Sequence, residues 1–257
     1  MKSKYRKNSD PQTKEPKAVL ETEKVDYKHR GTALEGYLAY DRAIKGKRPG
    51  VLVVHCFRGL RDFVKERTEL LANLGYIAFA LDMYGVGVKP KDDQEAFALA
   101  KTYGDNRPLM RSHANAGLEV LRGHELTDVK RIGAMGYCFG GGVVLELARS
   151  GAEIAGVVGF HANLNTPNPD DAKNIKGKVL VLHGADDPVV PTDQVLAFQD
   201  EMRKAKVDWQ MVFYGGAVHG FTMPESGTDH SKIAAYNEKA DKRSWEAMKA
   251  FFSEVFK

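Results

Sequence analysis

The 257-residue sequence contains few cysteines and no long hydrophobic run. Its two cysteines, Cys56 and Cys138, stand far apart and form no CxxC pair. A small secreted disulfide scaffold would carry more cysteines, and a structural zinc site would need a thiol pair. No stretch approaches the roughly 20 apolar residues that span a membrane. These absences argue against a disulfide-rich, a zinc-braced or a membrane-spanning protein.

The chain also has little net charge and no recognisable signal sequence. Its formal net charge is +4. Much of this charge comes from the first 17 positions, which contain Lys2, Lys4, Arg6, Lys7, Lys14 and Lys17 against Asp10 and Glu15. We expect residues 1–17 to form a solvated, disordered basic tail rather than an arm that binds nucleic acid. The missing apolar segment favours a cytoplasmic protein, although a chain already stripped of its signal would look the same.

What the sequence does contain is a series of short apolar runs separated by helical patterns. The runs are Val51–Val54, Ile77–Leu81, Ile132–Met135, Ala155–Phe160, Val179–Leu182 and Trp209–Tyr214. Such runs are typical of strands buried on both faces, and the intervening helices imply parallel strands joined by right-handed crossovers. Two alternating runs, Ala18–Tyr27 and Ala33–Tyr40, predict an N-terminal β-hairpin.

The expected fold class is therefore α/β, with a mainly parallel central sheet flanked by helices. With 43% hydrophobic and 28% charged residues, the composition suits one soluble domain, which we place at residues 18–257. Residues 89–123 are less regular and predict two helices, which we expect to partly roof the site. A last helix is expected from Ser231 to Phe256.

The strongest motif is a glycine-rich turn around Cys138. Residues 136–142 read GYCFGGG, follow the run Ile132–Met135 and open a helical pattern. A strand, a tight turn and a helix form the context of a nucleophile elbow, in which glycines let neighbouring backbones pass closely. A helix N-terminus also favours the thiolate form of cysteine. The alternative is a buried, inert cysteine beside a glycine turn.

Two further motifs follow later strands. Asp187 lies in the segment HGADDPVVP, residues 183–191. Its place three residues after Gly184 and four before Pro191 makes it a better candidate than Asp186 to hold a histidine. The alternative role for both aspartates is to cap a turn. His219 lies in the loop sequence GGAVHGF. The order Cys138, Asp187, His219 is the nucleophile–acid–base order of α/β-hydrolases.

With these motifs the chain resembles the dienelactone hydrolase family, a cysteine-using branch of the α/β-hydrolases. The resemblance extends over residues 18–256, with further matches at Val51–Leu60 and Leu81–Gly85. It implies that Cys138 is the nucleophile, His219 the base and Asp187 the residue that orients His219. It also implies an oxyanion hole made by the backbone amides of Phe57 and Phe139.

The chain departs from the family pattern at Cys56. Members of the family usually carry there a glutamate, in a His-Glu or Gln-Glu dipeptide, that touches the nucleophile thiol; here the dipeptide is His55-Cys56. Cys138 must then be activated by His219 alone, or Cys56 acts near the site as a modulator. A Cys56–Cys138 disulfide as an off-switch and a simple packing role for Cys56 are both open, although disulfide geometry is demanding.

A second departure concerns the substrate. Family members that cleave dienelactone hold its carboxylate with arginines, one of them four residues after the catalytic histidine, where this chain has Met223. Arg107 or Arg111 could substitute. The expected pocket is mostly apolar, which favours an uncharged short-chain ester or lactone over dienelactone: Phe57, Tyr84, Phe139, Phe160, Phe221 and Met223, with His161 beside them.

No cofactor or metal is expected. His55, His161 and His183 stand at strand ends without metal-binding spacing, so structural hydrogen bonding is the default role for His55 and His183. We expect a thioester intermediate, activity that rises with pH as His219 loses its proton, and a monomer or small homo-oligomer acting on a small molecule. The alternatives are a thiol redox or sensing protein that uses Cys56 and Cys138, a non-catalytic binding module, and a transferase or thioesterase for larger acyl donors.

Overall fold

The computed structural model describes residues 18–257, so the predicted basic tail lies outside the described residues. These residues form a sheet with the strand order β1-β2-β4-β3-β5-β6-β7-β8. Strands β3 to β8 are parallel, and β2 pairs antiparallel with both β1 and β4. The bounds are β1 (Leu20–His29), β2 (Thr32–Asp41), β3 (Arg48–Val54), β4 (Ile77–Leu81), β5 (Thr127–Tyr137), β6 (Gly156–Phe160), β7 (Lys178–Gly184) and β8 (Trp209–Tyr214).

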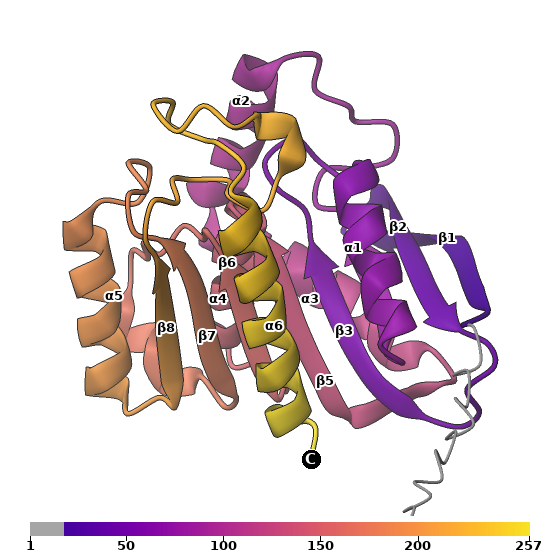
Figure 1. Ribbon diagram of the computed structural model, residues 1–257. Coiled ribbons are helices and arrows are strands. Elements are labelled where there is room, and N and C mark those ends of the chain that lie inside the picture. Colours follow the sequence, from indigo (N-terminus) through magenta and orange to yellow (C-terminus); the bar gives the residue numbers. More distant parts are fainter. Residues whose placement is uncertain (1–17) are drawn as a thin grey trace, which may run out of the picture.

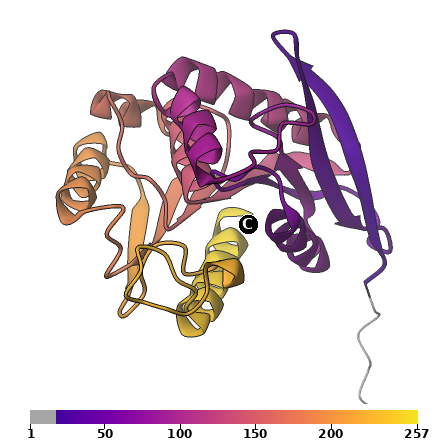
Figure 2. The ribbon, with the colours of Figure 1, turned by 90° about the horizontal axis from the view of Figure 1, so that it is seen from above.

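Helices cover both faces of this sheet (Figure 1). Helices α1 and α6 lie on one face, and α3 and α4 lie on the other, as the view from above shows (Figure 2). The helices are α1 (Asp62–Asn73), α2 (Asp93–Gly104), α3 (Arg107–Gly123), α4 (Phe139–Arg149), α5 (Thr192–Ala205) and α6 (Glu238–Val255), with short 3₁₀ helices η1 (Pro169–Asn174) and η2 (Pro224–Ser226). The predicted α/β-hydrolase architecture, with its N-terminal hairpin, is confirmed.

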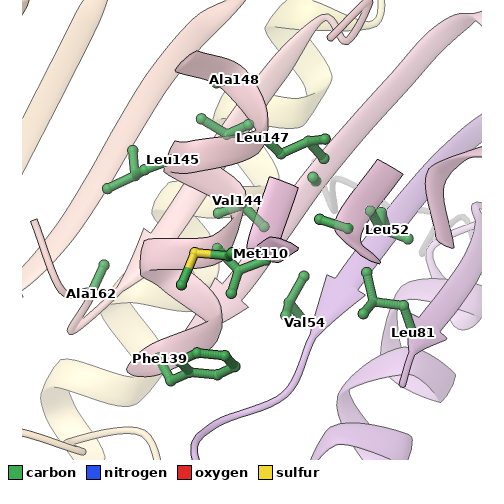
Figure 3. Close-up of a cluster of buried hydrophobic side chains, with 14 of the residues drawn as sticks. Leu52, Val54, Leu81, Met110, Phe139, Val144, Leu145, Leu147, Ala148 and Ala162 are labelled. Carbon is green, nitrogen blue, oxygen red and sulfur yellow. The ribbon is translucent and has the colours of Figure 1, made fainter. Parts of the chain in front are cut away.

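The sheet separates two hydrophobic clusters. In β3, Leu52 and Val54 point toward α3 and α4, whereas Val51 and Val53 point toward α1 and α6. Figure 3 shows the first of these clusters, where Val54 lies near Met110 of α3 and Phe139 at the start of α4. Burial on both faces explains why the strand sequences read as continuous apolar runs instead of alternating ones.

The region predicted to roof the site divides into two unlike helices. The buried residues of α3 include Met110, Leu118 and Leu121, so this helix packs on the sheet as part of the core. Of these two helices, α2 is the one at the top of Figure 1, above the carboxyl edge of the strands. Helix α3 therefore packs its apolar stripe on the sheet, while its first turn, with Arg107 and Met110, lines a cavity beside the start of α4 together with α2.

Helix α6 begins at Glu238, seven residues after the predicted start. Asn237 caps it by accepting a hydrogen bond from the backbone amide of Ala240, which fixes the first turn there. The residues just before it instead support the loop after β8, since Ala235 donates a backbone hydrogen bond to His219 and Asn237 donates one to Phe221.

The carboxyl ends of the parallel strands share one edge of the sheet. Cys138 follows β5, and the loops after β7 and β8 carry Asp187 and His219. Ligand sites of open α/β sheets form at this edge, which is where the fold brings the candidate residues together. None of the helices in residues 18–257 has the length and hydropathy needed to cross a membrane.

Candidate active site

Cys138 occupies a strained turn between β5 and α4. Its backbone angles are φ 54° and ψ −115°, a conformation that a non-glycine residue rarely adopts. The turn is held by hydrogen bonds from the Cys138 amide to Phe160 and to the Cys138 carbonyl from Gly142. Strain of this kind persists only where the surroundings over-determine it, and it aims the side chain out from the sheet edge.

Glycines make the turn possible because backbones meet there. A Cβ atom on Gly136 would collide with the carbonyl of Gly140, and one on Gly140 would collide with the carbonyl oxygens of Val54 and His55. The end of β3 is thus packed directly against the start of α4. This contact places the loop after β3 beside Cys138.

His219 lies between Cys138 and Asp187. Its Nε2 is 3.0 Å from the Cys138 Sγ, and its Nδ1 is 2.8 Å from the Asp187 Oδ2. All three residues are buried, with exposed fractions of 7–9%. The structure therefore brings together the three residues that the sequence singled out, in the geometry needed for a proton to move between sulfur and imidazole.

The choice between the two aspartates is clear in the geometry. The second carboxylate oxygen of Asp187 accepts backbone hydrogen bonds from Val189 (2.8 Å) and Val190 (3.2 Å), which fix its orientation toward His219. Asp186 instead points to the surface, where it accepts a hydrogen bond from the amide of Gly216. Only Asp187 contacts His219.

The electrostatics favour a charged imidazole. Burial by itself lowers the pKa of His219, but the negative charge of Cys138 and the hydrogen bond to Asp187 outweigh it and raise the pKa to about 10. The imidazole of His219 is thus favoured in its charged form at neutral pH. The sulfur of Cys138 and the carboxylate of Asp187 both stabilise the positive charge of the ring.

Two backbone amides are available near the sulfur. Phe139 is the first residue of α4, whose amide has no partner within the helix, and Phe57 lies in the turn after β3. Neither amide donates a hydrogen bond to another of the described residues. They are the donors that the sequence suggested for an oxyanion hole.

Cys56 is a buried, protonated thiol. Both cysteines are free in the structure. Burial raises the pKa of Cys56 to about 12, with a further contribution from the charge of Cys138, so the thiol keeps its proton at neutral pH. Because the thiolate is the form that reacts in disulfide exchange, Cys56 is poorly suited to redox chemistry in this state.

One cavity lies beside Cys56 and another beside the start of α4. One of about 640 Å³ is lined by Cys56 and the start of α1, and one of about 260 Å³ lies between α2, α3 and the first turn of α4. Arg107 lines the smaller cavity together with Phe139 and Asn163. Arg111 does not, because Glu146 and Asp171 bind its guanidinium. Of the two arginines considered from the sequence, only Arg107 reaches a cavity beside the site.

The residues expected to line the pocket are divided between the site and the core. Tyr84 and Met223 are buried in the same cluster as both cysteines, and the Tyr84 hydroxyl donates a hydrogen bond to the Phe57 carbonyl. Phe160 and Phe221, with exposed fractions of 1% and 0%, pack in the core on the α1–α6 face. We therefore correct their role: they support the site from behind and do not reach a surface that substrate could contact.

His161 also lies behind the site. It is fully buried, adopts φ 37°, and places its Nε2 2.9 Å from the Thr222 Oγ1 and its ring 5.1 Å from that of His219. Sequence reasoning assigned it to the pocket and missed Phe97, which stacks on Phe57 at 4.4 Å while remaining 57% exposed. The available signal for Phe97 was an aromatic residue within the helical segment that was expected to roof the site.

Comparison with known proteins identifies a family. A model described as "Dienelactone hydrolase family" matches residues 34–256. Two solved structures cover 93% of this chain and 99% of their own: "m3DLH", at 39% identity and a TM-score of 0.89, and a dienelactone hydrolase-like promiscuous phosphotriesterase from metagenomic libraries, at 40% identity and 0.88.

A curated relative gives a more distant match. The "Probable 2-oxo-3-(5-oxofuran-2-ylidene)propanoate lactonase" of Bradyrhizobium is 26% identical over 215 residues, which cover 79% of this chain and 86% of the relative. The similarity thus extends over most of both proteins.

Proposed function

Because the chain belongs to the dienelactone hydrolase family and is accordingly an ester or lactone hydrolase, we propose that it cleaves its substrate with Cys138 as the nucleophile. His219 is the proton carrier and Asp187 holds its imidazole. The observation that supports this most directly is the continuous contact from Cys138 through His219 to Asp187, with distances of 3.0 and 2.8 Å.

The first half of the reaction forms a thioester. The Cys138 sulfur attacks the carbonyl carbon, and the carbonyl oxygen becomes an oxyanion that accepts hydrogen bonds from the amides of Phe57 and Phe139. When the tetrahedral intermediate collapses, the C–O bond of the ester breaks and His219 gives its proton to the departing alkoxide. In a lactone the alcohol stays attached through the ring.

The second half needs the opposite protonation state of the histidine. Once Cys138 is acylated it no longer carries the charge that stabilises the imidazolium, so the pKa of His219 falls. Neutral His219 then takes a proton from water, which attacks the thioester. We therefore expect thioester hydrolysis to rise with pH, as the sequence suggested for the whole reaction, whereas acylation is already supported at neutral pH.

We propose that the reacting end of the substrate is an uncharged short-chain ester or lactone. Met223 stands where an arginine would bind a substrate carboxylate, and it is buried among apolar side chains. Of the two arginines considered, only Arg107 lines the smaller cavity, where it could bind a negative group of the substrate. Dienelactone itself should therefore be no better a substrate than p-nitrophenyl acetate, and a much higher kcat/KM for dienelactone would contradict this substrate class.

The decisive experiment compares the two cysteines. Hydrolysis of p-nitrophenyl acetate and butyrate is measured under reductant for the wild type, Cys138→Ala and the matched control Cys56→Ala. We expect turnover by the wild type and by Cys56→Ala and none above background for Cys138→Ala. Intact mass after rapid quenching should show an acyl adduct that maps to Cys138. Equal rates in the wild type and Cys138→Ala would exclude Cys138 as the nucleophile.

The same assay separates the thiol redox alternative. A redox protein would lose two free thiols on oxidation with glutathione disulfide and regain them with reductant, without catalysing ester hydrolysis. The raised pKa of Cys56 argues against the redox function, because a protonated thiol does not take part in disulfide exchange. An absence of hydrolysis together with a reversible loss of both thiols would favour the redox function.

A phosphotriester is a second candidate substrate, favoured by the 40% identity with the structure described as a promiscuous phosphotriesterase. The Cys138 sulfur would form a bond to phosphorus as the P–O bond to a phenolate breaks. Adding diethyl p-nitrophenyl phosphate to the substrate panel tests this. Release of p-nitrophenol that depends on Cys138 would support it, and release at the background rate would exclude it.

A further inference from the structure

His55 joins the loops that follow β3 and β4. Its Nδ1 is 2.7 Å from the carbonyl oxygen of Cys56, and its Nε2 is 3.1 Å from the backbone amide of Met83. The imidazole is fully buried and packs against the rings of Tyr84, at 4.9 Å, and Phe139, at 6.2 Å. A buried side chain with both ring nitrogens bonded to backbone holds the two loops in one relative position.

These two contacts determine the tautomer. The Met83 amide can only donate, so Nε2 must accept and carries no hydrogen. The proton of the neutral ring is then on Nδ1, which donates to the Cys56 carbonyl. Burial lowers the pKa of His55, in agreement with a ring that stays neutral.

The orientation of the Cys56 carbonyl sets that of the next amide. Residues 18–257 contain no cis peptide bond, and in a trans peptide the C=O and N–H point in opposite directions. The Cys56 carbonyl faces His55 and also accepts a hydrogen bond from Gly59 at 3.1 Å. The Phe57 amide consequently points away from the His55 ring.

The following carbonyl is fixed as well. The Tyr84 hydroxyl donates to the carbonyl oxygen of Phe57 at 2.8 Å. The turn itself stands close to the nucleophile elbow, since a Cβ atom on Gly140 would collide with the carbonyl oxygens of Val54 and His55. The carbonyl groups on both sides of the Phe57 N–H, those of Cys56 and Phe57, are therefore each fixed by a hydrogen bond from a side chain.

We propose that His55 is a positioning residue, which holds the Phe57 amide toward the oxyanion that forms at Cys138, and that the Tyr84 hydroxyl is its second support. The inference rests on the proposed function, because it requires an acyl group on Cys138. In this role His55 affects the transition state only by orienting the Phe57 amide, and it transfers no proton.

The test compares His55→Leu with His55→Asn. Leucine fills the site but donates no hydrogen bond, whereas the asparagine amide can donate from the place of Nδ1. We expect kcat for p-nitrophenyl acetate to fall about 100-fold in His55→Leu, the effect of a misplaced oxyanion donor, with little change in KM. His55→Asn should restore kcat to within about tenfold of the wild type.

Alkylation of Cys138 by iodoacetamide provides the second readout, with the modified residue identified by mass spectrometry. Alkylation needs the thiolate but no oxyanion hole, so its rate should be unchanged in His55→Leu. An unchanged kcat in His55→Leu would overturn the proposal. A parallel loss of hydrolysis and alkylation in a variant that keeps the wild-type circular dichroism spectrum would also overturn it, because His55 would then maintain the nucleophile. Hydrolysis that persists in Cys138→Ala would instead show that the proposed function fails.

Tyr84→Phe keeps the proposal testable if His55→Leu does not fold. This variant removes one hydroxyl and retains the ring. We expect kcat to fall about tenfold with alkylation unchanged, since the Phe57 carbonyl loses a single hydrogen bond. A wild-type kcat in Tyr84→Phe would then decide against the proposal by itself.

Discussion

Asp186 and Asp187 are neighbours in the sequence but face different parts of the molecule. Asp187 holds the buried imidazole of His219, and Asp186 caps the exposed turn at Gly216. This pair is a matched comparison, because the same Asp→Asn change can be made one residue apart. It separates the contribution of a buried carboxylate from that of a surface hydrogen bond.

We expect Asp187→Asn to lower kcat by about a thousandfold or more, since loss of the carboxylate disturbs the tautomer of the imidazole. The pKa of His219 should fall, because one of the groups that raise it is gone. The alkaline limb of the acylation profile, which the wild type should show near pH 10, then moves to lower pH. Pre-steady-state bursts measured across pH would reveal this, with Asp186→Asn close to the wild type. Identical pH profiles for both variants would contradict the geometry.

Gly140 has no room for a side chain. We expect Gly140→Ala to lower the free energy of unfolding by about 1–3 kcal/mol and to reduce kcat, because the added methyl group must push β3 away from the elbow. Gly123→Ala is the control: a Cβ there meets nothing within 4 Å. Urea unfolding followed by circular dichroism compares them, and equal stability of the two variants would show that the elbow tolerates a side chain.

At the scale of elements, a buried ionic network ties α4 to its neighbours. Arg149 of α4 binds Glu201 of α5 at 2.7 and 2.8 Å and Glu146 at 3.0 Å, and Glu146 in turn binds Arg111 of α3. The side chains of Arg149, Glu146 and Glu201 are 0–3% exposed. The helix that begins at the nucleophile is thus anchored at its far end by charges that water does not reach.

Removing Arg149 should leave Glu201 buried without its partner. We expect Arg149→Met to lower the free energy of unfolding by about 3–5 kcal/mol, as is typical when one member of a buried pair is lost. The same change at Arg203, whose partner Asp200 is 60% exposed, should alter it by less than about 1 kcal/mol. Denaturant titrations of both variants provide the measurement. A small effect at Arg149 would show that water or a rearranged acid replaces it.

The elements themselves were predictable where the hydrophobic pattern was continuous. The run at residues 51–54 identified β3, because a strand buried on both faces needs no alternation. The side on which α3 packs was not recognised, although Met110, Leu118 and Leu121 follow the helical period. The three residues in contact at the elbow came from their motifs and order.

The surroundings of the site were less predictable for a physical reason. Phe160 and Phe221 are near Cys138 and His219 in the fold, but which face of the sheet a side chain occupies at a strand end depends on local twist and loop geometry. The contacts of His55 depend on a second loop that is distant in the sequence. A sequence motif identifies the residues at a strand end, but it does not determine the relative orientation of two loops that are distant in the sequence.

At the scale of the whole molecule, charge is unevenly distributed along the chain. Residues 1–17 contain six basic and two acidic side chains, which equals the formal net charge of +4, so residues 18–257 are formally neutral. Removal of residues 1–17 would therefore remove the whole formal net charge.

We expect a chain that begins at residue 18 to keep its kcat and its free energy of unfolding but to be less soluble near neutral pH, where its net charge is close to zero. Precipitation by polyethylene glycol, compared with that of the full chain, measures the solubility. A loss of activity on truncation would show that the basic segment takes part in the site, and equal solubility would show that it does not govern association.

The pairing of β3 with β5 has a consequence for the order of events in folding. Gly50 pairs with Ile132, so these central strands meet only after a long loop of chain has been closed at a cost in entropy, whereas the helices form from local contacts. The nucleophile elbow is complete only when the end of β3 lies against Gly140. On refolding from urea, the helical circular dichroism signal should therefore recover before esterase activity does, and Cys138 should be most easily oxidised during that interval.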